Sequence, residues 1–223
     1  MLDLFGKYDR LPSLLLDFAC GTGNFSVRFA KKGIEVIGVD RSEGMLSVAR
    51  EKNYALKTPV FYLKQSGEEL DLYGTVDGAF CGLDSLNHIT DYEALKKCIA
   101  KISLFLERDR LFIFDVNTVY KHKEILGNNT FRIKKRGVDC IWANRLLEDG
   151  VTVQISLNFK YKTGFFKTEE MGESFYERAY TEEELESALN EAGFRIEAIF
   201  GEDGKTKPAL NSQRNIYVVR KVK

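Results

Sequence analysis

Two carboxylates and two glycines near the start of the chain have the residue types and the spacing of a ligand site. Asp17 stands four residues before Gly21, Gly23 follows, and Asp40 comes 19 residues after Gly21. Glycines let a backbone approach a ligand closely, and a helix that starts after them offers free N–H groups. A carboxylate about 20 residues after the first glycine, at the end of the next strand, can reach ribose hydroxyls. The pattern predicts a site for a ligand that contains a nucleoside.

The same glycine pattern also opens dinucleotide-binding domains, in which a pyrophosphate sits at the helix N-terminus. Two residues argue against that ligand. Ser26 stands where the dinucleotide pattern has a third Gly or Ala, and the charge of Asp17 would oppose a pyrophosphate. Asp17 instead suits a ligand with an ammonium and a sulfonium. A NAD(P)-dependent oxidoreductase stays open as an alternative, because Tyr92 and Lys96 form a Tyr-x-x-x-Lys pair.

The elements that must position these residues alternate between short apolar runs and amphipathic stretches, which is typical of βαβ units around a parallel sheet. Five apolar runs predict strands, at residues 14–20, 35–40, 59–64, 75–81 and 110–115. Residues 90–107 predict a helix with a capping box formed by Thr90 and Glu93. A second capping box, Thr181 with Glu184, opens a helix that ends at Gly193, and strands follow at 194–200 and 215–221.

After Thr118 the sequence pattern changes to short β-prone runs, which predict antiparallel hairpins. The runs are divided by three glycine-containing turn sequences, at residues 135–137, 148–150 and 162–164. The sequence thus predicts an α/β fold with a doubly wound, mostly parallel seven-stranded sheet, helices on both faces and an antiparallel β insertion. We expect residues 1–126 and 180–223 to form a Rossmann-like cofactor-binding domain, and residues 127–179 to form the insertion, covering the acceptor site.

These motifs resemble those of the S-adenosylmethionine-dependent methyltransferases of the Rossmann-like class. Asp17–Gly23 (DFACGTG) is similar to the first motif of that family, Val39–Leu46 to its second, and Cys81–Asn87 to its fourth-strand segment. Phe112–Asn117 and Glu177–Tyr180 are similar to a bacterial small-molecule subgroup with an antiparallel insertion after the fifth strand. The resemblance implies transfer of a methyl group from S-adenosylmethionine to an amine or hydroxyl of a small-molecule acceptor, by in-line attack.

The resemblance also implies roles for individual residues. Asp17 and the glycine turn would hold the methionine end, Asp40 the ribose hydroxyls, and Met45 would pack on the adenine. The implied cofactor-binding residues are Asp17, Ala19, Cys20, Gly21, Gly23, Asp40, Arg41, Met45, Gln65, Ser66, Gly67 and Cys81. The implied acceptor contacts are Tyr8, Asn87, Arg178 and Tyr180, and the candidate base is His88, which follows the fourth-strand segment. A loop histidine that bonds only its own backbone is the open alternative for His88.

Two departures from the family pattern keep a non-catalytic, partner-binding protein open as a further alternative. Ser66 stands where the family usually has an acid that binds the adenine amino group. Sixteen residues precede Asp17, fewer than the family usually has before its first motif, so we expect a reduced lid over the ligand or a more open site.

The composition limits the function classes. Lys plus Arg number 33 and Asp plus Glu 33, so no global field attracts a nucleic acid, and we expect none as a partner. No apolar run approaches the roughly 18 residues of a membrane span, and the N-terminal segment does not read as a secretory signal, so we expect a cytoplasmic protein that does not enter a membrane. The four widely spaced cysteines and two histidines predict neither a disulfide framework nor a metal site. The sequence does not indicate the oligomeric state or the acceptor.

Overall fold

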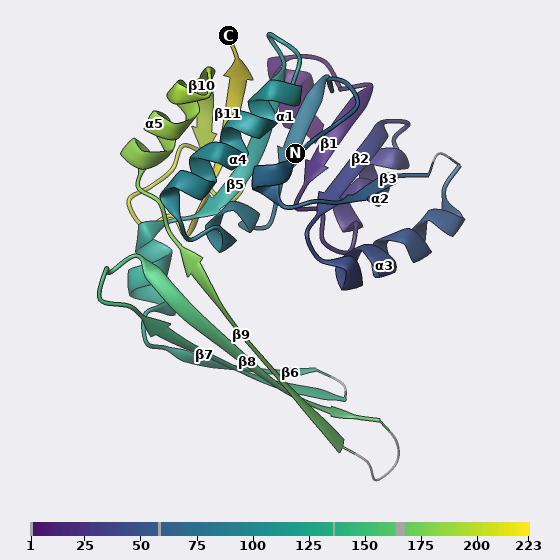
Figure 1. Ribbon diagram of the computed structural model, residues 1–223. Helices are drawn as coiled ribbons and strands as arrows, with labels where there is room; N and C mark the ends of the chain where they lie inside the picture. The colour runs from purple at the N-terminus through teal and green to yellow at the C-terminus, as the bar shows by residue number, and fades with distance from the viewer. Residues whose placement is uncertain (1, 58, 136, 164–167) are drawn as a thin grey trace.

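A seven-stranded, mostly parallel sheet is the centre of the computed structural model, which describes residues 2–57, 59–135, 137–163 and 168–223 (Figure 1). The strand order is β10-β11-β5-β4-β1-β2-β3. Strand β11 is antiparallel to β5 and β10, and the other neighbours are parallel. The strands are β1 (Leu14–Phe18), β2 (Glu35–Asp40), β3 (Phe61–Lys64), β4 (Gly78–Cys81), β5 (Leu111–Asn117), β10 (Phe194–Phe200) and β11 (Arg214–Lys221). The predicted fold class is confirmed.

Helices cover both faces of this sheet, because neighbouring strand residues point to opposite sides. Leu15 joins a core with α1 (Leu2–Tyr8), α2 (Asn24–Ala30) and α3 (Glu43–Glu51). Leu16 joins the other core, with α4 (Tyr92–Phe105) and α5 (Glu182–Glu191). Short helical turns connect several of these elements: η1 (Lys52–Ala55), η2 (Gly67–Glu69), η3 (Ser85–His88) and η4 (Lys121–Leu126). This is the predicted doubly wound arrangement.

Several element ends differ from the sequence prediction for local reasons. Strand β1 stops at Phe18, since Ala19 has a left-handed backbone with φ 55°. Val76 forms only an isolated bridge to Leu106, so β4 is shorter than residues 75–81. The capping box predicted at Thr90 is wrong: Asp91 caps α4, and its carboxylate accepts the Ala94 N–H at 2.8 Å. Asp is as good a cap as Thr, and the helix begins one residue later.

The second predicted capping box is confirmed. The Thr181 hydroxyl accepts the Glu184 N–H at 3.2 Å, and the Glu184 carboxylate accepts the Thr181 N–H at 2.9 Å. Gly193 follows α5 with φ 82°, as expected for a glycine after a helix end. Within the ranges that the structure describes, no helix is long and apolar enough to cross a membrane.

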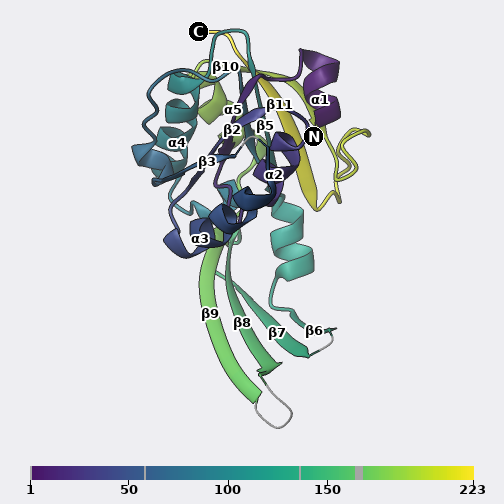
Figure 2. The ribbon, with the colours of Figure 1, turned by 90° about the vertical axis from the view of Figure 1, so that its right-hand side faces the viewer.

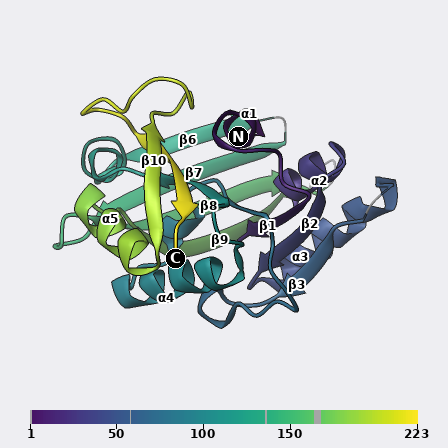
Figure 3. The same cartoon turned by 90° about the horizontal axis from the view of Figure 1, so that it is seen from above.

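A separate antiparallel sheet, in the order β6-β7-β8-β9, forms between η4 and α5. Figures 1 and 2 show it projecting from the edge at which β1, β2 and β5 end, and Figure 3 shows it extending beneath the main sheet. The turn at Glu148–Gly150 is one of the predicted hairpin turns, and the other two turn sequences fall partly outside the described residues. The strands are β6 (Thr130–Lys135), β7 (Val138–Leu146), β8 (Thr152–Lys162) and β9 (Thr168–Arg178).

Candidate active site

The glycine turn after β1 presents bare backbone at one end of the main sheet. Gly21 and Gly23 have φ values of 54° and 72°, which glycine adopts without strain. A Cβ on Gly21 would meet nothing within 4 Å, whereas a Cβ on Gly23 would overlap the Tyr62 hydroxyl. Cys20 begins the turn, and its carbonyl accepts the Gly23 N–H at 2.9 Å. The turn is therefore closely packed at Gly23, whereas the space next to Gly21 is open.

Asp40 fixes this turn from the end of β2. One carboxylate oxygen accepts the Gly21 N–H and the other accepts the Ser42 N–H, each at 2.8 Å. Each carboxylate oxygen can accept a second hydrogen bond, so Asp40 retains acceptor sites for a ligand's hydroxyls. Met45, in the first turn of α3, is 48% exposed, and its N–H donates to the Ser42 hydroxyl at 3.3 Å. Arg41 is exposed beside them.

Asp17 lies beneath the turn, buried in β1 and only 2% exposed. The buried Ser26 hydroxyl, from α2, donates a hydrogen bond to its carboxylate. Burial raises the pKa of Asp17 to about 7, Ser26 opposes this rise, and the Asp40 charge adds to it. Ser26 thus has a definite role: it is the hydrogen-bond donor to the acid of the first motif.

The residues after β3 are held by their own local bonds. The Gln65 side chain bonds the Asp71 backbone in both directions, at 2.9 and 3.1 Å. The Ser66 hydroxyl donates to Glu69 at 2.7 Å, so an acid does stand next to the position where the sequence has Ser66. A Cβ on Gly67 would press on Phe18, at 2.6 Å, so only glycine fits there without a shift.

The turn after β4 is shaped by Asp115 of β5. Its carboxylate accepts the N–H groups of Leu83 at 2.8 Å and Asp84 at 3.1 Å, two residues with left-handed φ values of 58° and 53°. Arg214 of β11 pairs with Asp115 at 2.9 Å and with Asp84 at 2.8 Å. Cys81, at the end of β4, is fully buried, and burial raises the pKa of its thiol. The thiol is therefore not a nucleophile, and the residue can offer a ligand only its backbone.

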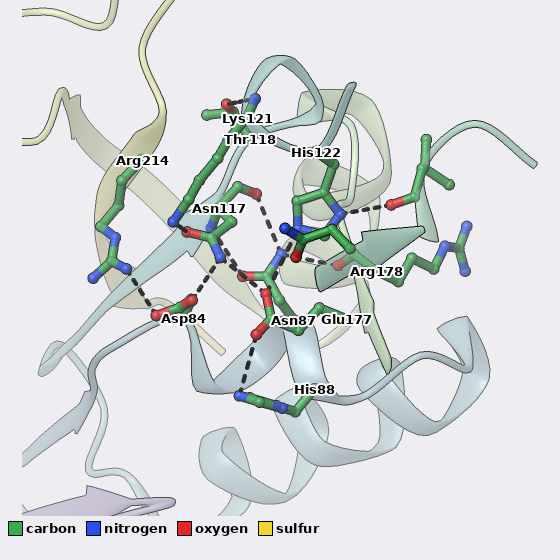
Figure 4. A network of polar contacts seen from close by, with 12 residues as sticks. Asp84, Asn87, His88, Asn117, Thr118, Lys121, His122, Glu177, Arg178 and Arg214 are labelled. Atoms are coloured by element: carbon green, nitrogen blue, oxygen red, sulfur yellow. Dashed lines mark hydrogen bonds and ion pairs between the residues drawn. The ribbon is translucent and has the colours of Figure 1, made fainter. Parts of the chain in front are cut away.

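A polar network joins this turn to η4 and β9 (Figure 4). The Asn117 amide nitrogen donates to Asp84 at 2.5 Å and to Glu177 at 3.1 Å, and Lys121 donates to the Asn117 amide oxygen at 2.8 Å. Glu177 is 5% exposed, and burial, with the Asp84 charge, raises its pKa to about 7. The sequence alone indicates no role for Glu177, although this residue lies inside the segment Glu177–Tyr180.

Both histidines of the chain face Glu177 (Figure 4). His88 Nε2 lies 3.7 Å from one carboxylate oxygen, and His122 Nε2 lies 3.8 Å from the other. The His88 ring is tilted on Phe175, with 5.2 Å between ring centroids, and burial lowers the pKa of His88. His122 carried no sequence signal beyond its residue type, since its contact with Glu177 arises only when η4 packs on β9.

The four residues expected to contact the acceptor make packing contacts or hydrogen bonds within the protein. Asn87 is fully buried, and its amide bonds the backbone of Asn117, at 2.9 and 3.2 Å, and of Arg178, at 2.9 Å. The Tyr180 hydroxyl donates to the Ile89 carbonyl, and Arg178 stacks on the Tyr180 ring and pairs with Glu184 at 2.5 Å. These three residues tie β9 to η3 and α5.

Tyr8 lies elsewhere. Its ring packs on Phe200 and its carbonyl accepts a hydrogen bond from Arg220, which is opposite Leu111, the first residue of β5. The structure therefore places Tyr8 with the packing of α1, apart from the glycine turn.

The residues at the carboxyl end of the sheet fit a nucleoside ligand with a cationic end. Open space above Gly21 admits a ligand against the backbone, Asp40 keeps free acceptor sites beside it, and Met45 offers an exposed apolar surface. Ligands of open α/β sheets bind at this edge. The Asp40 carboxylate, together with Asp17 when it is ionised, makes the site negative, which disfavours a pyrophosphate.

Comparisons with known proteins agree with that class of ligand. The methyltransferase domain family matches residues 15–109. A putative methyltransferase from Geobacillus sp. (strain WCH70) is 30% identical over 207 residues, which cover 93% of this chain and 84% of that protein. The crystal structure of an S-adenosylmethionine-dependent methyltransferase from Clostridium acetobutylicum is 31% identical, with a TM-score of 0.88, covering 94% of this chain and 84% of that one.

A more distant structure shares the fold. CalS10 from Micromonospora echinaspora, an amino pentose methyltransferase solved with bound S-adenosylmethionine, has a TM-score of 0.78 at 17% identity, covering 99% of this chain and 88% of that one. The chain belongs to the S-adenosylmethionine-dependent methyltransferases, and S-adenosylmethionine is its cofactor. The family assignment sets aside the NAD(P)-dependent alternative and identifies the protein as an enzyme.

Proposed function

We propose that the enzyme methylates the amino group of a small molecule that has an apolar body. The observation that carries this proposal is the composition of one face of the second sheet. Strand register places alternate residues on the same face. On β9 this face reads Glu169, Met171, Glu173, Phe175 and Glu177. Across it, β8 contributes Val153, Ile155, Leu157, Phe159 and Tyr161, and β7 contributes Val138, Cys140, Trp142, Asn144 and Leu146.

This face is the one that meets the main sheet. Glu177 bonds Asn117 of β5 at 3.1 Å, and Phe175 contacts His88 of η3. An acceptor held between this face and the glycine turn would lay its apolar body on Met171, Phe175 and their neighbours. The Glu173 carboxylate, which lies between Met171 and Phe175 on this face, favours a cation, and therefore an amine, which is an ammonium at neutral pH, over a hydroxyl. We assign the acceptor-covering role to residues 127–179 and cofactor binding to residues 1–126 and 180–223.

The chemistry requires alignment and a neutral nucleophile. When bound, S-adenosylmethionine would supply a methyl carbon activated by its sulfonium, with a neutral thioether as the leaving group. The residues of this chain then have three tasks. Asp40 and the glycine turn hold the cofactor, the apolar face excludes water, and His88 takes a proton from the acceptor ammonium. Alignment alone can supply roughly 7 to 11 kcal/mol.

Binding of the cofactor is measured first, by calorimetric titration with S-adenosylmethionine and S-adenosylhomocysteine, with NADH as the control. Turnover is then compared for pairs of aryl-alkyl amines and alcohols of the same body. We expect transfer to the amine of each pair, growing with apolar size. Transfer to the alcohol alone, or only to strongly polar amines, would refute the proposed acceptor class.

Two variants of β9 test the face itself. Met171 is 53% exposed on the proposed acceptor face, and Tyr176 is 45% exposed on the opposite face of the same strand. Losing part of the apolar contact costs about 1 to 2 kcal/mol, so Met171→Ala should raise the KM of the acceptor about tenfold. Tyr176→Ala should leave that KM unchanged. The expected cytoplasmic location and the absence of a nucleic-acid partner stay predictions.

A further inference from the structure

His122 is held in one tautomer by the backbone. Its Nδ1 lies 2.8 Å from the Val151 carbonyl oxygen, which can only accept, so Nδ1 carries the hydrogen. In the neutral ring Nε2 is then an unprotonated acceptor. Within the part of the chain that the structure describes, this Nε2 is buried and has no hydrogen-bond partner. Oε2 of the Glu177 carboxyl lies 3.8 Å from it.

An ionised carboxylate facing an imidazole lone pair is unfavourable, most of all where water is excluded. His122 is 0% exposed and Glu177 is 5% exposed. One proton on the pair, carried either by Oε2 of Glu177 or by Nε2 of His122, removes the conflict. The geometry therefore requires Glu177 and His122 together to retain one proton.

The surrounding charges are balanced, so the proton can move. Glu177 faces Asp84 from the turn after β4, Lys121 from η4 and Arg214 from β11. His122 faces Lys121, Asp84 and Asp149. Burial raises the pKa of Glu177 and lowers the pKa of His122, so in the resting state the proton lies on Glu177.

His88 lies on the other side of the same carboxyl, 3.7 Å from Oε1, with a side chain that is 41% exposed. Besides Glu177 it faces Asp84, Arg41, Glu173 and Asp40. Arg41 and Asp40 follow β2 and belong to the cofactor side, and Glu173 belongs to the acceptor face of β9. His88 therefore connects the acceptor region with the buried pair.

We propose that Glu177 and His122 share one proton, and that this pair sets the proton affinity of His88, the base for the acceptor amine. The proposal rests on the proposed function for the identity of the acceptor. When the acceptor ammonium gives a proton to Nδ1 of His88, the shared proton moves from Glu177 to His122. Glu177 is then a carboxylate beside the His88 imidazolium. An N–H bond of the acceptor breaks as the Nδ1–H bond of His88 forms, and the O–H bond of Glu177 breaks as the Nε2–H bond of His122 forms. Glu177 and His122 are positioning residues.

Histidine NMR tests the shared proton without any substrate. The chain has two histidines, so nitrogen-edited spectra contain two imidazoles, and His88→Asn assigns them. We expect His122 to keep the Nδ1–H tautomer and to titrate together with a second group. Glu177→Gln should remove that coupling and move the His88 titration midpoint to lower pH. A His122 that titrates alone, unchanged in Glu177→Gln, would overturn the proposal.

Glu173→Gln is the matched control, because Glu173 lies on the same face of β9 and faces His88 but not His122. It should shift the His88 signal alone. In turnover assays Glu177→Gln should lower kcat about tenfold and move the acid limb of its pH profile with the His88 midpoint. If the imidazoles are coupled but no amine is methylated, the proposed function fails and the shared proton stands. If amines are methylated by a protein with independently titrating imidazoles, the shared proton fails.

Discussion

Replacing Asp17 with Asn should stabilise the ligand-free protein at neutral and alkaline pH while weakening cofactor binding. The folded-state pKa of Asp17 is about 7, above the reference value of 3.8, because the carboxyl is buried. The folded state therefore binds this proton more tightly than the unfolded state does. Stability is highest when Asp17 is protonated and falls as the pH rises from about 4 to about 7. Asn keeps the shape and removes the charge.

The magnitude follows from the two pKa values. Above pH 7 the ionised carboxyl costs on the order of 4 kcal/mol relative to the unfolded chain. Between pH 5 and pH 8 the free energy of unfolding of Asp17→Asn should rise relative to wild type by about 2 to 3 kcal/mol. Urea denaturation at several pH values measures this. Glu177 is present in both proteins, so its own titration cancels in the difference.

Two further measurements distinguish this explanation from a general packing effect. Ser26→Ala removes the hydroxyl that donates to Asp17, so the loss of stability with rising pH should be larger than in wild type. Asp17→Asn should bind S-adenosylmethionine more weakly by about 1.5 to 3 kcal/mol, through loss of a charge-assisted contact with the cationic end. Stability curves for Asp17→Asn and wild type that run parallel from pH 5 to pH 8 would refute the reasoning.

Two other predictions concern the scaffold. Gly23→Ala should lower the free energy of unfolding by about 2 to 4 kcal/mol, because the new Cβ overlaps the Tyr62 side chain. Gly21→Ala has open space around it, so it should lower the free energy of unfolding by only the roughly 1 to 2 kcal/mol of a left-handed backbone. Equal losses for the two variants in urea denaturation would contradict this. Thr181→Ala should lower the free energy of unfolding by about 1 kcal/mol, because it removes the N-cap of α5. Thr90→Ala removes no cap and should lower it by less than about 0.5 kcal/mol. A large loss for Thr90→Ala would show that Thr90 caps α4, as the sequence predicts.

The sequence predicts the main sheet well because its signals are local. Each strand is a short apolar run between polar flanks, and the glycine turn with Asp40 has a spacing that the βαβ unit fixes. Element ends are predicted less well. The end of β1 depends on the left-handed φ of Ala19, and the start of α4 on a choice between Thr90 and Asp91, two adjacent residues that can both cap a helix.

The acceptor side is predicted less well because its contacts are long-range. Asn117 and Glu177 are 60 residues apart in the chain, and only the packing of β9 against β5 brings them together. The family resemblance drew attention to Arg178 and Tyr180, which tie β9 down. Their neighbour Glu177 points the other way, toward both histidines, because successive residues of a strand face opposite sides.

Two buried carboxyls with a pKa of about 7, Asp17 and Glu177, stand near the same edge of the sheet, yet their surroundings imply different roles. Asp17 is near a hydroxyl donor and a second acid, so its ionised form is favoured only when a cation binds beside it. Glu177 has an imidazole lone pair on one side and an imidazole base on the other, so it can ionise by passing its proton to His122. One carboxyl is thus suited to a charged ligand and the other to a moving proton. The proposed methylation of an amine uses both, since the cofactor carries a fixed charge and the acceptor ammonium must lose its proton before the nitrogen can attack.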